Sequence, residues 1–178
     1  MKIALIGDGK MARAIAPLAS ERGHVVTVML GERENARAAG ISRSALGEPD
    51  VAIEFTEPSA AAANVVACAR AGIPIVVGTT GWYDQLETVS AEVSALRGTM
   101  FWAPNFSLGV AAISAAIDAV ARAIGDARGF DMHLVETHHS AKKDRPSGTA
   151  VALARIVAGA SGRDVPVTSI RTGHVPGT

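Results

Sequence analysis

The sequence has one cysteine, few aromatic residues and no excess of charge of either sign. The single cysteine, Cys68, excludes an intrachain disulfide and a cysteine-rich zinc site. The 17 Lys and Arg residues balance 17 Asp and Glu residues, so the net charge gives no reason to expect binding to nucleic acid or to an anionic membrane. Evidence for partners must therefore come from local features of the chain.

The sequence also lacks a long, uninterrupted apolar run. The opening MKIALIGDG is too short for a signal peptide, and Asp118 and Arg122 interrupt the longest apolar segment, residues 110–124. With 48% hydrophobic and 19% charged residues, the 178-residue chain has the composition of a globular protein with one ordinary domain or two small ones. We expect a reducing, cytoplasmic location and neither nucleic-acid nor membrane partners.

The first part of the chain alternates short β-branched runs with longer alanine-rich runs. Strands are expected over residues 2–7, 24–30, 50–56, 73–81 and 99–105, and helices over 10–22, 58–71 and 83–96, with one short helix around 34–39. This alternation predicts an α/β fold, a Rossmann-like doubly wound parallel sheet covered on both faces. Cys68 falls in an alanine-rich helical run, where a small buried residue is expected rather than a nucleophile.

The pattern changes after residue 105. The sequence predicts a long helix over 108–125, apolar on most sides and largely buried, then a strand over 130–138, a helix over 147–160 and a strand over 167–172. We expect a dinucleotide-binding domain over 1–104 and a partial α+β substrate-binding domain over 105–178. Two strands rarely make a stable sheet alone, so we expect this second domain to be a fragment, truncated at its C-terminal end.

A glycine-rich turn follows the first expected strand. Gly7, Gly9 and Ala12 fit the pattern G-x-G-x-x-[G/A], which allows a tight turn, close approach of a pyrophosphate to backbone amides, and close helix packing. The candidate cofactor-binding residues of this turn are Gly7, Gly9, Lys10, Met11 and Ala12. Such turns also begin α/β folds that bind no cofactor.

Two adjacent charged residues follow the second expected strand. Glu32 lies about 20 positions after Ala12, where an acidic side chain accepts a hydrogen bond from an adenosine ribose 2′-hydroxyl. Arg33 could instead pair with a 2′-phosphate. The pair leaves both NADH and NADPH open, and the two residues could equally be solvated surface charges.

Later loops fall at the same edge of the predicted sheet, where open parallel sheets bind their ligands. Their small residues allow close approach of a ring, and their Thr and Asn side chains offer hydrogen bonds. The candidate cofactor-binding residues here are Phe55, Thr56, Gly78, Thr79, Thr80, Ala103, Pro104, Asn105 and Phe106.

The stretch ETHHSAKKDRPSGTA, residues 136–150, gathers histidines, lysines and small hydroxyl residues in an otherwise apolar region. With the glycine turn, EFTEP at 54–58, GTTG, APNFSLG and IRTGHVPG at 170–177, it makes the chain resemble the dihydrodipicolinate (4-hydroxy-tetrahydrodipicolinate) reductase family of bacterial lysine and diaminopimelate biosynthesis. The match spans essentially the whole chain. Its histidine-to-threonine segment is highly specific, whereas the glycine turn is generic.

The resemblance implies an NAD(P)H-dependent oxidoreductase that converts 4-hydroxy-tetrahydrodipicolinate, a small dicarboxylate heterocycle, to tetrahydrodipicolinate. His138 matches the family's general acid, and histidine is the side chain best suited to proton donation near neutral pH. Lys142 matches a lysine that binds substrate or donates a proton. The implied substrate-binding residues are His139, Ser147, Gly148 and Thr149. The resemblance also implies a homotetramer.

Simpler interpretations remain open for several of these residues. Ser147 is also a plausible helix N-cap, and Glu136 could orient a histidine, cap a helix or lie on the surface. Lys143 and Arg145 are interpreted as solvated charges. The adjacent histidines suggest a metal, but sequence neighbours seldom point the same way, so we expect no metal site.

Two other functions compete with the reductase. One is a different NAD(P)-dependent dehydrogenase acting on an amino-acid-like substrate, which would share the glycine turn without needing HHSAKKDRPSGT. The other is a non-catalytic or truncated nucleotide-binding paralogue, which would bind reduced cofactor without turnover.

Overall fold

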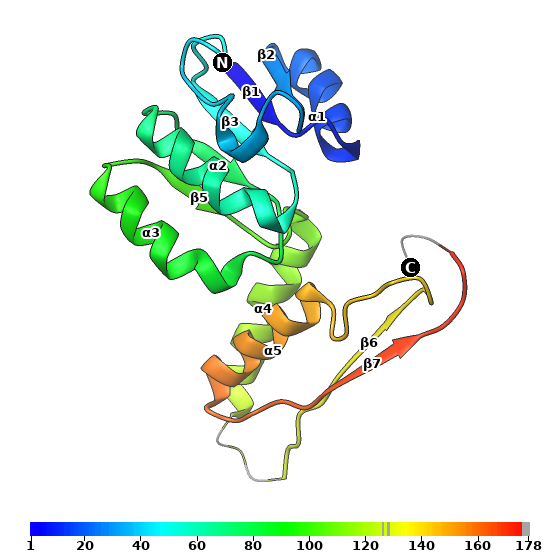
Figure 1. The fold of residues 1–178 in the computed structure, drawn as a ribbon. Helices are drawn as coiled ribbons and strands as arrows, with labels where there is room; N and C mark the ends of the chain where they lie inside the picture. The colour runs from blue at the N-terminus through cyan, green and yellow to red at the C-terminus, as the bar shows by residue number, and fades with distance from the viewer. Residues whose placement is uncertain (126, 128, 176–178) are drawn as a thin grey trace. The chain divides into compact units, whose positions relative to one another are not determined.

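The computed structural model describes residues 1–125, 127 and 129–175, and the chain divides into two compact units, Met1–Ala103 and Pro104–Thr178. The first unit is an open parallel sheet with helices on both faces (Figure 1). Its strands are β1 Lys2–Ile6, β2 Val25–Leu30, β3 Val51–Glu54, β4 Ile75–Val77 and β5 Met100–Trp102. Its helices are α1 Lys10–Glu21, α2 Pro58–Arg70 and α3 Leu86–Ala95, with single 3₁₀ turns at η1 Ala36–Ala38 and η2 Tyr83–Gln85. The predicted fold class is therefore confirmed.

The strand order β2-β1-β3-β4-β5 places β1 at the point where the chain changes direction across the sheet. Every pairing is parallel, so the loops after β1 and β3 emerge side by side at the same edge. In open parallel sheets, ligands bind in the crevice at such a switch point. The topology alone therefore directs attention to the glycine turn and to the residues after Glu54.

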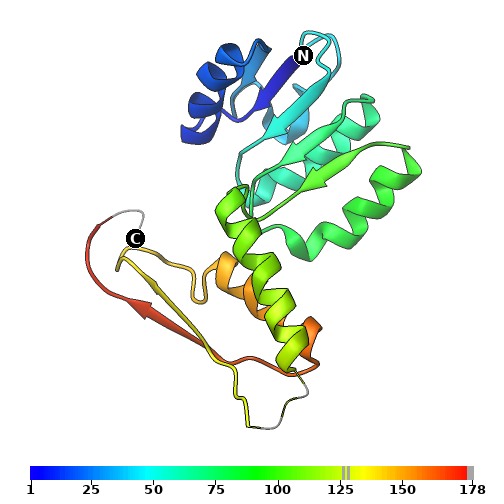
Figure 2. The same cartoon turned by 180° about the vertical axis from the view of Figure 1, so that it is seen from behind.

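Two apolar clusters hold the helices on the two faces of this sheet. Ile3 and Leu5 of β1 pack with Ala12 and Ala19 of α1, whereas Ala4 and Ile6 belong to the larger cluster beneath α2 and α3. Figure 2 shows the sheet and its helices from behind. A strand buried on both faces needs consecutive apolar residues, which explains the unbroken IALI of β1. Each fully buried aliphatic side chain contributes about 1.5–3 kcal/mol.

The second unit is a helix pair with a two-stranded sheet. Its elements are α4 Leu108–Ile124, β6 Leu134–His138, α5 Gly148–Ser161 and β7 Val167–Arg171. The strands β6 and β7 are parallel, and α5 is the crossover between them. The helices α4 and α5 pack closely, since a Cβ at Gly125 would come within 2.8 Å of Ser161 Cα.

The structure corrects one expectation about burial. Among the described residues of α4, Ala121 is buried, but Leu108, Ile113 and Val120 are 87%, 56% and 57% exposed. The helix is apolar on most sides, as predicted, yet α5 covers only one of them. Apolar composition therefore overestimated the burial of this helix.

Several element boundaries also differ from the sequence prediction. The expected helix over 34–39 is only η1, because Arg37 and Ala38 have φ of 55° and 61°. The helix expected over 83–96 begins as η2 before α3, and the strand expected over 130–138 begins at Leu134. Within the described residues, none of the helices is both long enough and apolar enough to cross a membrane.

Candidate functional site

The loops after β1, β2 and β3 enclose a cavity of about 350 Å³, here called the switch-point cavity. It is lined by Gly7, Asp8, Gly9, Leu30, Gly31, Glu32, Asn35, Phe55, Thr56, Glu57, Ser59, Ala60 and Asn64. Five predicted cofactor-binding residues are thus brought together, namely Gly7, Gly9, Glu32, Phe55 and Thr56. The cavity lies where the sheet topology places a ligand.

Gly7 makes the tight turn into this cavity. Its φ is +105°, and a Cβ there would lie 2.1 Å from the carbonyl oxygen of Phe55, so no other residue fits without displacing β3's loop. Gly9 is the N-cap of α1, and a Cβ at this position would have nothing within 4 Å. The first amides of α1 have no intrahelical acceptors, so this end of the helix suits an anion such as a pyrophosphate.

The loop after β2 brings Glu32 to the cavity wall, whereas Arg33 is exposed and does not line it. Asn35, which was not predicted, is also part of the wall. Its Nδ2 donates to Asn64 Oδ1 at 2.8 Å, while its own buried Oδ1 has no hydrogen-bond partner. A buried acceptor without a partner is costly, so the wall is suited to a ligand that supplies a donor, such as a ribose hydroxyl.

A buried polar group supports the loops after β3 and β4. Thr56 Oγ1 donates to the fully buried carboxylate of Glu54, and the Thr56 amide donates to Thr79 Oγ1 at 2.8 Å. The ring of Phe55 fills the space beside Gly78, where a Cβ would come within 2.1 Å of it. Gly78 and Thr79 therefore support Phe55 and Thr56, which line the cavity, without lining it themselves.

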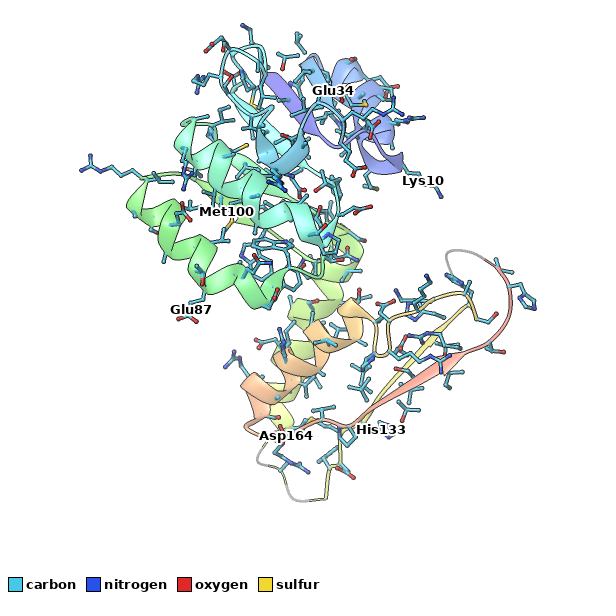
Figure 3. The ribbon with its side chains drawn as sticks, viewed as in Figure 1. Lys10, Glu34, Glu87, Met100, His133 and Asp164 are labelled. Carbon is cyan, nitrogen blue, oxygen red and sulfur yellow. The ribbon has the colours of Figure 1, made fainter. Side chains whose placement is uncertain are left out.

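The other predicted cofactor-binding residues do not line the switch-point cavity. Lys10 (Figure 3) is exposed at the start of α1. Met11 is also exposed, while Ala12 is buried and lets that helix pack closely on β1. Thr80 is exposed. Ala103 ends the first unit, and Pro104, Asn105 and Phe106 begin the second unit. Their cofactor roles stay predictions.

A larger, open groove of about 870 Å³ lies over α2, α3 and η1, but it contains none of the predicted residues. Two of its arginines are already paired: Arg43 lies 3.2 Å from Glu48, and Arg70 lies 2.6 Å from Glu92. Buried nearby in α2, Cys68 is no nucleophile, because burial and then the charge of Glu54 raise the pKa of its thiol to about 12.

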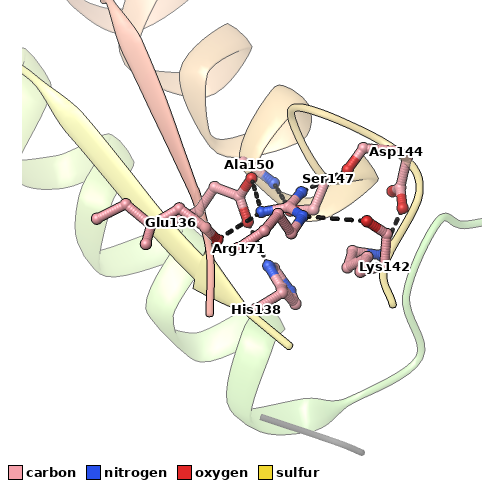
Figure 4. A network of polar contacts seen from close by, with 8 residues as sticks. Glu136, His138, Lys142, Asp144, Ser147, Ala150 and Arg171 are labelled. Carbon is pink, nitrogen blue, oxygen red and sulfur yellow. Dashed lines mark hydrogen bonds and ion pairs between the residues drawn. The ribbon is translucent and has the colours of Figure 1, made fainter. Parts of the chain in front are cut away.

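The second polar site lies at the ends of β6 and β7 and in the loop before α5 (Figure 4). It is called the His138 cluster, and its members are Glu136, His138, Lys142, Asp144, Ser147 and Arg171. Figure 4 shows Arg171 between Glu136 on one side and the backbone of Lys142 and Asp144 on the other. Three of the predicted catalytic and substrate-binding residues, His138, Lys142 and Ser147, thus lie in one cluster.

Glu136 is at the centre of this cluster. Its Oε2 contacts His138 Nδ1, and its Oε1 lies 2.8 Å from Arg171 Nη1, an ion pair between side chains that are 8% and 2% exposed. Burial acts to raise the pKa of Glu136, but hydrogen bonds from Ser169, Arg171 and His138 outweigh it and lower the pKa from 4.5 to about 2. The carboxylate is therefore ionised near neutrality.

Lys142 Nζ lies 2.8 Å from Asp144 Oδ1. The pKa of Asp144 is lowered, first by the hydrogen bond from Lys142 and more weakly by the backbone amide of Gly148. Gly148 is the first residue of α5, whose N-cap is Ser147. A lysine and a helix N-terminus thus already stabilise one carboxylate at this place.

Ser147 has the N-cap role that competed with substrate binding. Its Oγ accepts from the Ala150 amide at 3.1 Å, and the side chain is buried. Gly148 is exposed, and Thr149 and His139 are partly exposed. The substrate roles of these four residues stay predictions. Among the residues that the structure describes, no three His, Cys, Asp or Glu side chains are arranged to hold a metal ion.

Comparison with known proteins identifies the family. Residues 1–106 match the profile described as dihydrodipicolinate reductase, N-terminus, and residues 109–178 match its C-terminal counterpart. The chain belongs to the dihydrodipicolinate reductase family. The resemblance drawn from the motifs is therefore confirmed.

Individual relatives of this family agree with the profiles. The 4-hydroxy-tetrahydrodipicolinate reductase of Nitratidesulfovibrio vulgaris strain DP4 is 35% identical over 92% of this chain and 66% of its own length. This chain therefore spans just under two thirds of the length of that relative. That of Xanthomonas campestris pv. campestris strain B100 is 36% identical over 96% of this chain and 73% of its own. A dipicolinate-bound dihydrodipicolinate reductase from Paenisporosarcina sp. TG-14 has the same fold, with a TM-score of 0.66 and 20% identity over 98% of this chain and 80% of its own.

Within the family motif IRTGHVPG, sequence reasoning missed the role of Arg171. Its Nε donates to Lys142 O at 3.3 Å, and its Nη2 donates to Asp144 O. The signal was present, since a basic residue that ends a short strand inside a family motif needs a partner. The partner itself is distant in sequence. Residues 176 and 177 of this motif lie outside the described residues.

Proposed function

We propose that this chain converts 4-hydroxy-tetrahydrodipicolinate to tetrahydrodipicolinate, with loss of the hydroxyl as water and reduction by NADH or NADPH, as part of lysine and diaminopimelate biosynthesis in the cytoplasm. The observation that carries the proposal is the His138 cluster, in which an imidazole, a lysine and a helix N-terminus lie together. The relatives named above carry this activity in their names.

The substrate has two carboxylates, and the cluster offers positive groups for them. The Asp144 carboxylate is stabilised by Lys142 and by the Gly148 amide, which is the environment a substrate carboxylate requires. We propose that Lys142, with the start of α5, neutralises one carboxylate and holds the ring near His138. Positive charge placed there in advance also stabilises negative charge that develops during reduction.

A bound reduced nicotinamide would supply hydride. The role of His138 is to donate the proton that must reach the neighbouring ring atom. Its Nδ1 is engaged by Glu136, so Nε2 is the nitrogen from which the proton leaves. After donation the imidazole is neutral and keeps its Nδ1 proton.

The switch-point cavity fits the adenosine half of such a cofactor. It combines the free amides of α1, the carboxylate of Glu32 and the unpartnered Oδ1 of Asn35. Because Glu32 lines the cavity and Arg33 does not, we propose a preference for NADH, whose ribose keeps its 2′-hydroxyl. Exchanging Glu32 for Gln should raise the KM for NADH more than that for NADPH.

The test is oxidation of reduced nicotinamide, followed by its near-ultraviolet absorbance, with freshly generated synthase product as substrate. We expect turnover, and we expect His138→Ala to lower kcat by about 100-fold or more. The matched control is His133→Ala, which removes a histidine of the same unit whose Nε2 bonds Thr168 Oγ1 at 2.7 Å. Binding of reduced cofactor without turnover would contradict the proposal and favour a non-catalytic paralogue.

The family resemblance also suggests how the chain assembles. We propose a homotetramer formed through the second unit, where apolar side chains such as Leu108 and Val135 are 87% and 58% exposed. Sedimentation equilibrium should give four times the chain mass of 18.2 kDa. A monomer at assay concentrations would exclude this arrangement.

A further inference from the structure

The ends of β6 and β7 place four polar side chains on one face of the two-stranded sheet. Glu136 pairs in register with Ser169, and His138 pairs with Arg171. Residues two apart in a strand share a face, and residues in register lie side by side. The local fold therefore brings a carboxylate, an imidazole and a guanidinium into contact.

The contacts connect these groups in series. Glu136 is bonded to His138 through one carboxylate oxygen and paired with Arg171 through the other, at 2.8 Å. Arg171 continues to the loop before α5, where its Nε and Nη2 bind the carbonyl oxygens of Lys142 and Asp144. One buried side chain therefore holds both the partner of His138 and the backbone that carries Lys142.

We propose that Glu136 and Arg171 are positioning residues for the proton donor: Glu136 fixes His138 with its proton on Nδ1 and Nε2 toward the substrate, and Arg171 locks Glu136 and the Lys142 loop in one geometry. This inference rests on the proposed function, in which His138 donates the proton. Neither residue touches the reacting atoms in this scheme. Glu136 acts through the imidazole, and Arg171 acts through Glu136 and the loop backbone.

The surrounding charges support this division of roles. Besides Glu136, the charged groups near His138 are Arg171 on β7 and the Lys142–Asp144 pair in the loop, and His139 follows it in the chain. Arg171 is committed to Glu136 and to backbone carbonyls, and Lys142 is paired with Asp144. Glu136 is therefore the carboxylate that contacts the His138 ring directly.

The test compares Glu136→Gln with Asp131→Asn in the full protein. Asp131 is a matched control, because it is a carboxylate of the same unit, 99% exposed and 3.6 Å from Arg163. For Glu136→Gln we expect kcat to fall by about 10-fold or more with little change in KM.

A second measurement reports on His138 without turnover. In ¹⁵N NMR spectra of the histidine rings, the unsubstituted protein and Asp131→Asn should show His138 protonated on Nδ1 in its neutral form. Glu136→Gln should shift the ring toward the other tautomer. An unchanged tautomer together with an unchanged kcat overturns the proposal, as does a change in KM alone.

Arg171→Lys is the second variant, since it keeps the charge but loses the planar fork, which binds the carbonyl oxygens of Lys142, Asp144 and Ile170 and pairs with Glu136. It should lower kcat and broaden the His138 ring signals while leaving the titrating groups in place. An Arg171→Lys protein with normal kcat refutes the role of Arg171. If the unsubstituted protein shows no turnover, the proposed function fails, whereas the NMR tautomer still decides whether Glu136 fixes the ring.

Discussion

At the scale of single residues, substitution by alanine should have different effects at the two glycines of the turn after β1. In Gly7→Ala the new methyl would meet Phe55 O at 2.1 Å, at a φ of +105° that an L-residue rarely adopts. We expect the free energy of unfolding to fall by about 1–3 kcal/mol or more. Gly9→Ala should leave stability nearly unchanged, because nothing lies within 4 Å, but should weaken cofactor binding.

Urea unfolding and dinucleotide titration measure these two effects separately. Equal stability of the two variants would contradict the role assigned to Gly7. Equal cofactor affinity of Gly9→Ala and the unsubstituted protein would contradict the approach of a pyrophosphate at the start of α1.

At the residue scale, a local sequence pattern was enough to place several residues, whose binding roles stay predictions. Gly7, Gly9 and Glu32 follow from strand ends and spacing, and Ser147 follows from its position before an apolar helix. Arg171 and Asn35 did not follow, because their roles depend on partners distant in the chain, Glu136 and Asn64. A buried pair of this kind is fixed by tertiary packing, which no single window of sequence contains.

At the scale of elements, the two helices of the second unit offer a matched pair of N-caps. Ser147 caps α5 through a buried bond of 3.1 Å, and Ser107 caps α4 through an exposed bond of 3.4 Å. We expect Ser147→Ala to lower the free energy of unfolding by about 1–2 kcal/mol and Ser107→Ala by about 0.5 kcal/mol. Chemical denaturation followed by circular dichroism measures both, and a larger loss for Ser107→Ala would be unexpected.

The positions of the elements were predicted well because β-branched runs and alanine-rich runs alternate sharply in the first unit. Errors arose where tertiary context overrides composition. The stretch before Leu134 has strand-like residues, but β7 begins at Val167 and pairs with β6 only from Leu134 onward. Residues without a neighbouring strand have no ladder to join, so strand-like composition alone does not make a strand.

At the scale of the whole molecule, lowering the pH should unfold the second unit at a higher pH than the first unit. The pKa of Glu136 is about 2 in the folded chain against a usual 4.5. Its contribution to stability is therefore complete above about pH 4.5 and is lost as the pH falls toward 2. Asp144, whose pKa is also lowered, acts in the same direction.

The two tryptophans allow this to be measured, since Trp82 and Trp102 both belong to the first unit. On acidification we expect helical circular dichroism to decrease at a higher pH than tryptophan fluorescence changes. Glu136→Gln should flatten the acid dependence of the dichroism. Coincident transitions for the two signals would show instead that the units unfold together.

Phe55 has a consequence for the design of chimeras. Its carbonyl oxygen leaves no room for a side chain at position 7, and its ring leaves none at position 78. Three segments that are far apart in the chain are thereby made interdependent, so none can be exchanged alone. A loop grafted from another protein into one of these segments will fold correctly only if the other two keep compatible residues. These are glycine at positions 7 and 78, or a residue smaller than phenylalanine at position 55.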